Sequence, residues 1–121
     1  MYRFSNRSLK NLQGIDAKLI ILAGLMLNLS PYDFIITCGL RTKEEQRRMV
    51  DAGKSQTMNS KHIIGEAFDI VILVDGKITW EKKYYKEFTD VLKKLAKELR
   101  IEIICGYDFR NHWDCPHIQL K

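Results

Sequence analysis

The sequence predicts an α+β fold in which a small antiparallel sheet packs against helices. Runs rich in β-branched and aromatic residues are separated by longer segments whose apolar residues recur at helical spacing. One of these runs contains the tight-turn dipeptide Asp75-Gly76, which is typical of an antiparallel hairpin. The chain has 121 residues, no repeat and no Pro/Gly/Ser-rich linker, so we expect a single domain over residues 1–121.

The N-terminal third predicts two helices and a strand. A short helix or turn near residues 8–12 precedes a helix over 16–27, for which Asp16 is a suitable N-cap and Leu19 begins the apolar stripe. The segment 33–39 is rich in β-formers and ends in a glycine, so it predicts a strand.

The middle of the chain predicts a helix, a polar loop and a hairpin. Thr42 and Glu45 have the spacing of a capping box, in which each side chain bonds the backbone amide of the other residue. The helix that they start ends near Gly53, and a polar loop follows over 54–61. Residues 66–79 then predict a strand and a tight hairpin.

The C-terminal part predicts one long helix and two strands. Residues 80–99 carry apolar side chains along one helical face, including Tyr84 and Phe88, with Lys and Glu elsewhere. The runs 101–105 and 116–120 predict the last two strands.

The composition limits the possible functions and partners but does not identify one. The formal net charge of +5 favours anionic partners, such as nucleic acid, a membrane surface or a cell-wall polymer. Three cysteines, an odd number, predict reduced thiols in a chain made in the cytoplasm. The apolar run 19–27 follows basic residues, but it is shorter than the roughly 20 residues needed to span a bilayer, and no small-residue cleavage site follows. We therefore expect a buried helix, no cleaved signal and no stable membrane insertion.

Three polar residues point to a metal site. Asp69 lies among apolar neighbours in a strand, where an ionised carboxylate needs a compensating charge. If the last strand pairs with it, His117 projects from the same face, and Gly65 lets His62 fold back toward both. Two imidazoles and one carboxylate suit Zn²⁺ with a fourth position left for water. Asp114, three residues before His117, is then the candidate to hold that water and move its proton.

The same residues also have purely structural interpretations. A histidine is usually a satisfied core or surface residue, and a buried Asp is usually a structural hydrogen-bonding group. Arg41 could be a surface residue beside a helix start, and Cys115 is expected to be packed away rather than to act as a ligand or nucleophile. The pair His112 and His117 lacks the close cysteine pair that a zinc finger needs.

Two motifs resemble a known family. "SKHIIGEAFD" fits the pattern S-x-H-x-x-G-x-A-x-D, and "DCPH" fits D-x-P-H. With the upstream "GLRTKEEQ", they resemble the zinc peptidases of the LAS group, which comprises lysostaphin-type enzymes, D-Ala-D-Ala metallopeptidases and hedgehog-like domains. The stretches "FSNRSLKNLQGID" and "GKSQTMNSKH" look most like short phage endolysins of the L-alanyl-D-glutamate endopeptidase type.

The resemblance implies a hedgehog/D-Ala-D-Ala metallopeptidase-like fold and a role for each matching residue. Asp114 would be the catalytic base, in place of the Glu of some relatives, and Arg41 would bind a substrate carboxylate. Ser60 and Gln46 would support the substrate or the site. The implied zinc ligands are His62, Asp69 and His117.

The implied function is a zinc endopeptidase that cuts the L-Ala–D-Glu bond of the peptidoglycan stem peptide. It would act as a phage or prophage lysin that is made in the host cytoplasm and reaches the wall in the periplasm after the membrane is permeabilised. We expect a monomer that binds no nucleic acid. Two alternatives stay open, namely a D-Ala-D-Ala carboxypeptidase and a non-catalytic zinc-binding module. Asp114 argues against the second, because a pure binding module does not need that carboxylate.

Overall fold

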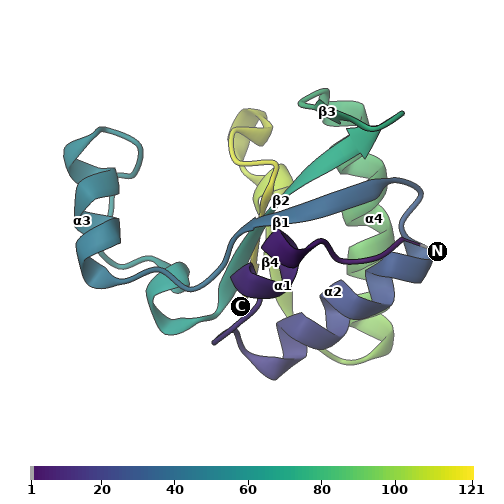
Figure 1. The fold of residues 1–121 in the computed structure, drawn as a ribbon, viewed down its shortest axis with the longest axis horizontal. Coiled ribbons are helices and arrows are strands. Elements are labelled where there is room, and N and C mark those ends of the chain that lie inside the picture. The colour runs from purple at the N-terminus through teal and green to yellow at the C-terminus, as the bar shows by residue number, and fades with distance from the viewer. Residues whose placement is uncertain (1) are drawn as a thin grey trace.

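The computed structural model describes residues 2–121, and its centre is a five-stranded antiparallel sheet (Figure 1). The strands are β1 (Asp33–Cys38), β2 (Ala67–Val74), β3 (Lys77–Thr79), β4 (Ile103–Cys105) and β5 (His117–Leu120). The α-helices are α1 (Asn6–Asn11), α2 (Ala17–Leu29), α3 (Lys43–Asp51) and α4 (Lys82–Glu98). Short 3₁₀ turns are η1 (Lys61–Ile64), η2 (Gly106–Asp108) and η3 (Arg110–His112). The predicted α+β class is confirmed.

The strand order is β1-β2-β5-β4, with β3 added to β2 through the Asp75-Gly76 hairpin. Because side chains alternate across a strand, Phe68 and Ile70 of β2 face the core and Asp69 faces the opposite side. At β2 the sheet therefore has an apolar face, which packs in the core, and an opposite, polar face, which carries Asp69.

Helices α2 and α4 supply the apolar side chains of the helical layer, whereas α1 joins β1 through Ser8, whose hydroxyl accepts a hydrogen bond from the Ile36 amide. Phe34 of β1 meets Phe88 of α4 edge-on, with ring centroids 5.1 Å apart, in a core that also contains side chains of α2 and Leu12, the residue that follows α1. Helix α3 takes no part in this layer and stands apart from the sheet on the connection between β1 and β2 (Figure 1). Within residues 2–121, no helix combines the length and the apolar character that a bilayer span requires.

Local capping chemistry places the helix starts as predicted. The Asp16 carboxylate accepts a hydrogen bond from the amide of Lys18, and Thr42 and Glu45 form both bonds of the capping box. Each bond satisfies an amide that a helix start otherwise leaves unpaired.

The buried face of α4 differs in detail from the expected one. The sequence predicted Tyr84 on this face, but Tyr85 is the fully buried tyrosine, and Tyr84 is only partly buried. The Tyr85 hydroxyl accepts from the amide of Ile72 and donates to the carbonyl of Thr79. Both tyrosines lie within one turn of Phe88, so partners distant in sequence decided which one turns inward.

Candidate active site

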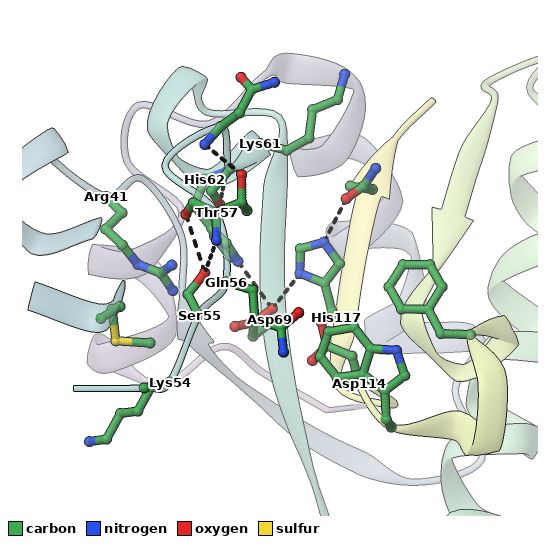
Figure 2. Close-up of a pocket in the computed structure, with 17 residues that line it drawn as sticks. Arg41, Lys54, Ser55, Gln56, Thr57, Lys61, His62, Asp69, Asp114 and His117 are labelled. Atoms are coloured by element: carbon green, nitrogen blue, oxygen red, sulfur yellow. Dashed lines mark hydrogen bonds and ion pairs between the residues drawn. The ribbon is translucent and has the colours of Figure 1, made fainter. Parts of the chain in front are cut away.

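A cleft of about 1070 Å³ crosses the polar face of the sheet. Its lining includes six of the seven residues singled out from the sequence, namely Arg41, Ser60, His62, Asp69, Asp114 and His117. The seventh, Gln46, is fully buried beneath it. Figure 2 shows Asp69 between His62 and His117, with Arg41 on one side and Asp114 on the other.

Strand pairing brings Asp69 and His117 together. The two residues are directly opposite each other in the antiparallel pairing of β2 with β5, so their side chains leave the sheet on the same face. The distance between His117 Nδ1 and Asp69 Oδ1 is 2.9 Å. The sequence argument assumed that the last strand pairs with the strand of Asp69, and the structure has this pairing.

His62 reaches the same carboxylate from η1. The Ser60 hydroxyl caps this turn by accepting a hydrogen bond from the His62 amide at 3.2 Å. Gly65 ends the turn in the left-handed conformation, with φ of 73°, which a residue with a side chain rarely adopts. His62 Nε2 lies 3.3 Å from Asp69 Oδ1, and the His62 and His117 rings are 5.1 Å apart.

In each imidazole, the outer ring nitrogen, which points away from Asp69, already has a hydrogen-bond partner. His62 Nδ1 lies 2.8 Å from the carbonyl oxygen of Gly39, and His117 Nε2 lies 2.8 Å from Gln119 Oε1. Carbonyl oxygens only accept, so both outer nitrogens are the donors. The inner nitrogens, His62 Nε2 and His117 Nδ1, therefore face Asp69 together. Metal-ligating histidines show this arrangement, in which the second nitrogen donates to a carbonyl or carboxylate.

His62, Asp69 and His117 strongly affect one another's pKa values. Burial alone lowers the pKa of His62, but hydrogen bonds with Asp69 and Cys38 outweigh it and raise the pKa to about 10. Burial alone raises the pKa of Asp69, but hydrogen bonds with His117 and His62 lower it to about 2. The pKa of His117 is also raised, because its bond to Asp69 outweighs burial. Without a metal the His62 imidazole holds a proton next to the carboxylate, and a bound cation would replace that proton.

Cys38 is a site residue that the sequence reasoning did not identify. One potential metal-binding cluster consists of Cys38, His62 and Asp69, each with a donor atom within 4.8 Å of the others. Its sulfur lies 3.8 Å from His62 Nδ1, which is the outer edge of that ring. A β-bulge between Ile36 and Cys38 brings the thiol to this face. No local sequence signal predicts this bulge. Cys105 and Cys115 are buried in the core, as expected for Cys115, and all three thiols are free.

Asp114 lies beside the cluster with a partly buried carboxyl group. Burial raises the pKa of Asp114, and the charge of Asp69 adds to this effect, whereas His117 opposes it. A carboxyl group with a raised pKa beside a cleft is the kind of group that exchanges protons in catalysis.

Arg41 is held at the other side of the cleft by two bonds. Its Nη1 donates to Gln46 Oε1 at 2.6 Å, and its Nη2 donates to the sulfur of Cys38 at 3.2 Å. The Gln46 amide nitrogen donates to the Ser55 hydroxyl and the Thr57 carbonyl, so Gln46 joins α3 to the following loop. Gln46 therefore positions Arg41 from below, and Arg41 itself faces the cleft.

Comparisons with known proteins point to one family. A family model described as phage L-alanyl-D-glutamate peptidase matches residues 1–120. The L-alanyl-D-glutamate peptidase of Escherichia phage T5 is 32% identical over 124 residues, which covers 99% of this chain and 90% of that protein. The L-alanyl-D-glutamate peptidase of Listeria phage A118 is 35% identical over 82 residues, covering 68% of this chain but only 28% of that longer protein.

A solved structure has the same fold. The crystal structure of the Serratia marcescens L-Ala D-Glu endopeptidase ChiX superposes with a TM-score of 0.90 at 37% sequence identity. The match covers 98% of this chain and 90% of that one.

Proposed function

The chain belongs to the phage L-alanyl-D-glutamate peptidase family, and we propose that it hydrolyses the L-Ala–D-Glu bond with one zinc ion held by His62, Asp69 and His117. The observation that carries this proposal is the convergence of His62 Nε2 and His117 Nδ1 on Asp69 Oδ1, at 3.3 and 2.9 Å. Two neutral nitrogens and one carboxylate oxygen form a donor set typical of catalytic zinc, which keeps a position open.

The fit to a metal is supported by the outer hydrogen bonds. Gly39 and Gln119 each fix one imidazole, so that its remaining nitrogen points at Asp69. Cys38 is an alternative third donor, but its sulfur approaches the His62 nitrogen that already donates to Gly39. We therefore assign His117 as the third ligand and Cys38 as a group that contacts the outer nitrogen of His62.

A zinc ion at this position would lower the pKa of water and offset the negative charge that develops on the scissile carbonyl oxygen. Asp114 takes the proton from the attacking water and delivers it to the departing amine of D-Glu. Arg41 binds a substrate carboxylate through the guanidinium N–H groups that Gln46 and Cys38 leave free. Ser60 keeps His62 in place by capping η1.

The biological setting follows from the family. We propose a phage or prophage lysin that is made in the host cytoplasm, acts as a monomer and meets the stem peptides of the wall in the periplasm once the membrane is permeabilised. The net charge of +5 favours association with an anionic wall polymer. We assign no nucleic-acid partner.

Digestion of purified peptidoglycan tests this function. The protein is incubated with sacculi after chelation and again after zinc is added back, and the products are identified by mass spectrometry. We expect cleavage only with metal, and new amino termini on Glu. Release of single D-Ala residues would instead identify a carboxypeptidase. Zinc binding without any cleavage would identify a non-catalytic module.

A further inference from the structure

Trp113 presents an open aromatic surface beside the catalytic cluster. It is 71% exposed, the highest value for a large apolar side chain within residues 2–121, and it lines the cleft next to Asp114. Phe109 also lines the cleft and stacks against the indole, with ring centroids 5.6 Å apart and planes inclined by 28°. One indole face is therefore supported by Phe109, and the other is free to contact a ligand.

The loop that carries Trp113 is held in an unfavourable conformation. Asn111 and His112 both have positive φ, at 58° and 53°, although neither is glycine. Lys82 fixes the loop by donating to the Asn111 carbonyl at 2.7 Å. The His112 ring stacks on the Tyr107 ring, with centroids 4.0 Å apart, and His112 Nδ1 hydrogen-bonds the carbonyl oxygen of Tyr107. Such strain persists only where the surroundings impose it, so the aromatic pair is fixed before a ligand arrives.

Arg41 and Trp113 both line the cleft, and they come from opposite sides of β2. Arg41 follows β1, and Trp113 precedes β5, and these strands flank β2 on its two sides. Asp69 of β2 lies between them, with Arg41 on one side and Asp114, the neighbour of Trp113, on the other (Figure 2). A bound peptide whose scissile bond lies at Asp69 therefore meets Arg41 with one half and Trp113 with the other.

The chemistry of the substrate indicates which half is which. In peptidoglycan, L-Ala is the first residue of the stem peptide and is joined to an amino sugar through the lactyl group of that sugar. The L-Ala–D-Glu bond is therefore the first peptide bond between two amino acids. D-Glu carries a free carboxylate on the other side of the bond. If Arg41 binds that carboxylate, the L-Ala side and its sugar extend toward Trp113.

We propose that Trp113, supported by Phe109, stacks on the amino sugar that carries the stem peptide and makes the enzyme prefer glycan-linked over free peptide. This proposal rests on the proposed function and extends its substrate class. The apolar C–H face of a sugar ring matches an aromatic face, and a rigid exposed ring gains contact area at little entropic cost.

The kinetic test compares two substrates with the same peptide sequence, one joined to N-acetylmuramic acid and one beginning at free L-Ala. The variants are W113A and the matched control W80A. Trp80 is also exposed, at 60%, but stacks on Tyr85 outside the cleft. We expect W113A to lower kcat/KM about five- to tenfold on the sugar-linked substrate and to leave the free peptide within twofold, with the loss mainly in KM. W80A should change neither.

A binding measurement gives a second readout without turnover. The chain contains two tryptophans, so W80F leaves Trp113 as the single tryptophan, and D114N slows cleavage enough for binding to be measured. We expect the emission of W80F/D114N to change when the muramyl-peptide is added and to stay unchanged with the free peptide at equal concentration.

Equal losses on both substrates for W113A, or equal fluorescence responses to both, would overturn the proposal. No effect of W113A on either substrate would overturn it as well. Failure of the proposed function is a different result, because wild-type protein would then cleave neither substrate between L-Ala and D-Glu.

Discussion

Cys38 lies directly opposite Asp69 in the pairing of β1 with β2, where a regular register from Ile36 and Ile70 would place Thr37. The bulge that causes this shift brings a thiol within 3.8 Å of His62 Nδ1 and 3.2 Å of the Arg41 guanidinium. Cys38 therefore connects the outer edge of one imidazole with the arginine that lines the cleft.

We expect C38S to keep one zinc per chain and to lose about 10- to 100-fold in metal affinity or activity, as is usual when a group that contacts a metal ligand is removed. The wild-type protein loaded with cobalt should lack the absorption band that thiolate coordination gives to this metal. Substitution of His62 by Gln is the matched variant that should abolish binding. A thiolate–cobalt band in the wild-type protein that disappears in C38S would show that Cys38 is a ligand.

Metal binding should release protons at pH 7. The pKa of His62 is raised to about 10 in the metal-free site, so this imidazole carries a proton at neutral pH, whereas a ligand must be neutral. Zinc titrations by calorimetry in buffers of different ionisation enthalpy measure this release. Above pH 10 the proton release should decline, because His62 is then already neutral. An apparent enthalpy that does not depend on the buffer at pH 7 would contradict the expected protonation.

Asp114 should set the acid limb of the activity profile. Activity needs its carboxylate, so kcat/KM rises with pH through the pKa of this group, which burial places above the ordinary Asp value of about 3.9. D114N should remove this limb and cost about 10²- to 10⁴-fold in kcat, which is the range for general acid–base groups. Zinc content, measured in parallel, should not change. A D114N protein with more than a tenth of wild-type activity would exclude Asp114 as the base.

Gly106 should be required for the position of Asp114. A Cβ atom on Gly106 would lie 1.9 Å from the Asp114 carbonyl oxygen, so the two backbone segments must separate in G106A. We expect kcat to fall about 10- to 100-fold with little change in zinc affinity, because displacements of about 1 Å have such effects on chemistry.

Gly24 provides the matched control for this substitution. It lies in α2 with nothing within 4 Å of its virtual Cβ, so G24A should keep full activity and gain about 0.5–1 kcal/mol in the free energy of unfolding. Wild-type kcat in G106A would show that the contact does not position Asp114.

Local chemistry let the sequence predict much of the fold. The N-cap at Asp16, the capping box of Thr42 and Glu45 and the turn at Asp75-Gly76 each depend on residues a few positions apart, and each is present. The strand alternation that places Asp69 away from the apolar face is a backbone property that needs no knowledge of distant partners.

The sequence by itself therefore determined the α+β class, the family and six of the polar residues that line the cleft. Only the tertiary structure decided that Cys38 faces His62, that Gln46 lies buried under Arg41 and that Trp113 stays exposed on Phe109. These features depend on a register shift, on hydrogen bonds between separate elements and on a loop fixed by Lys82. Each one depends on contacts between segments far apart in the chain, and the local sequence propensities do not encode such contacts.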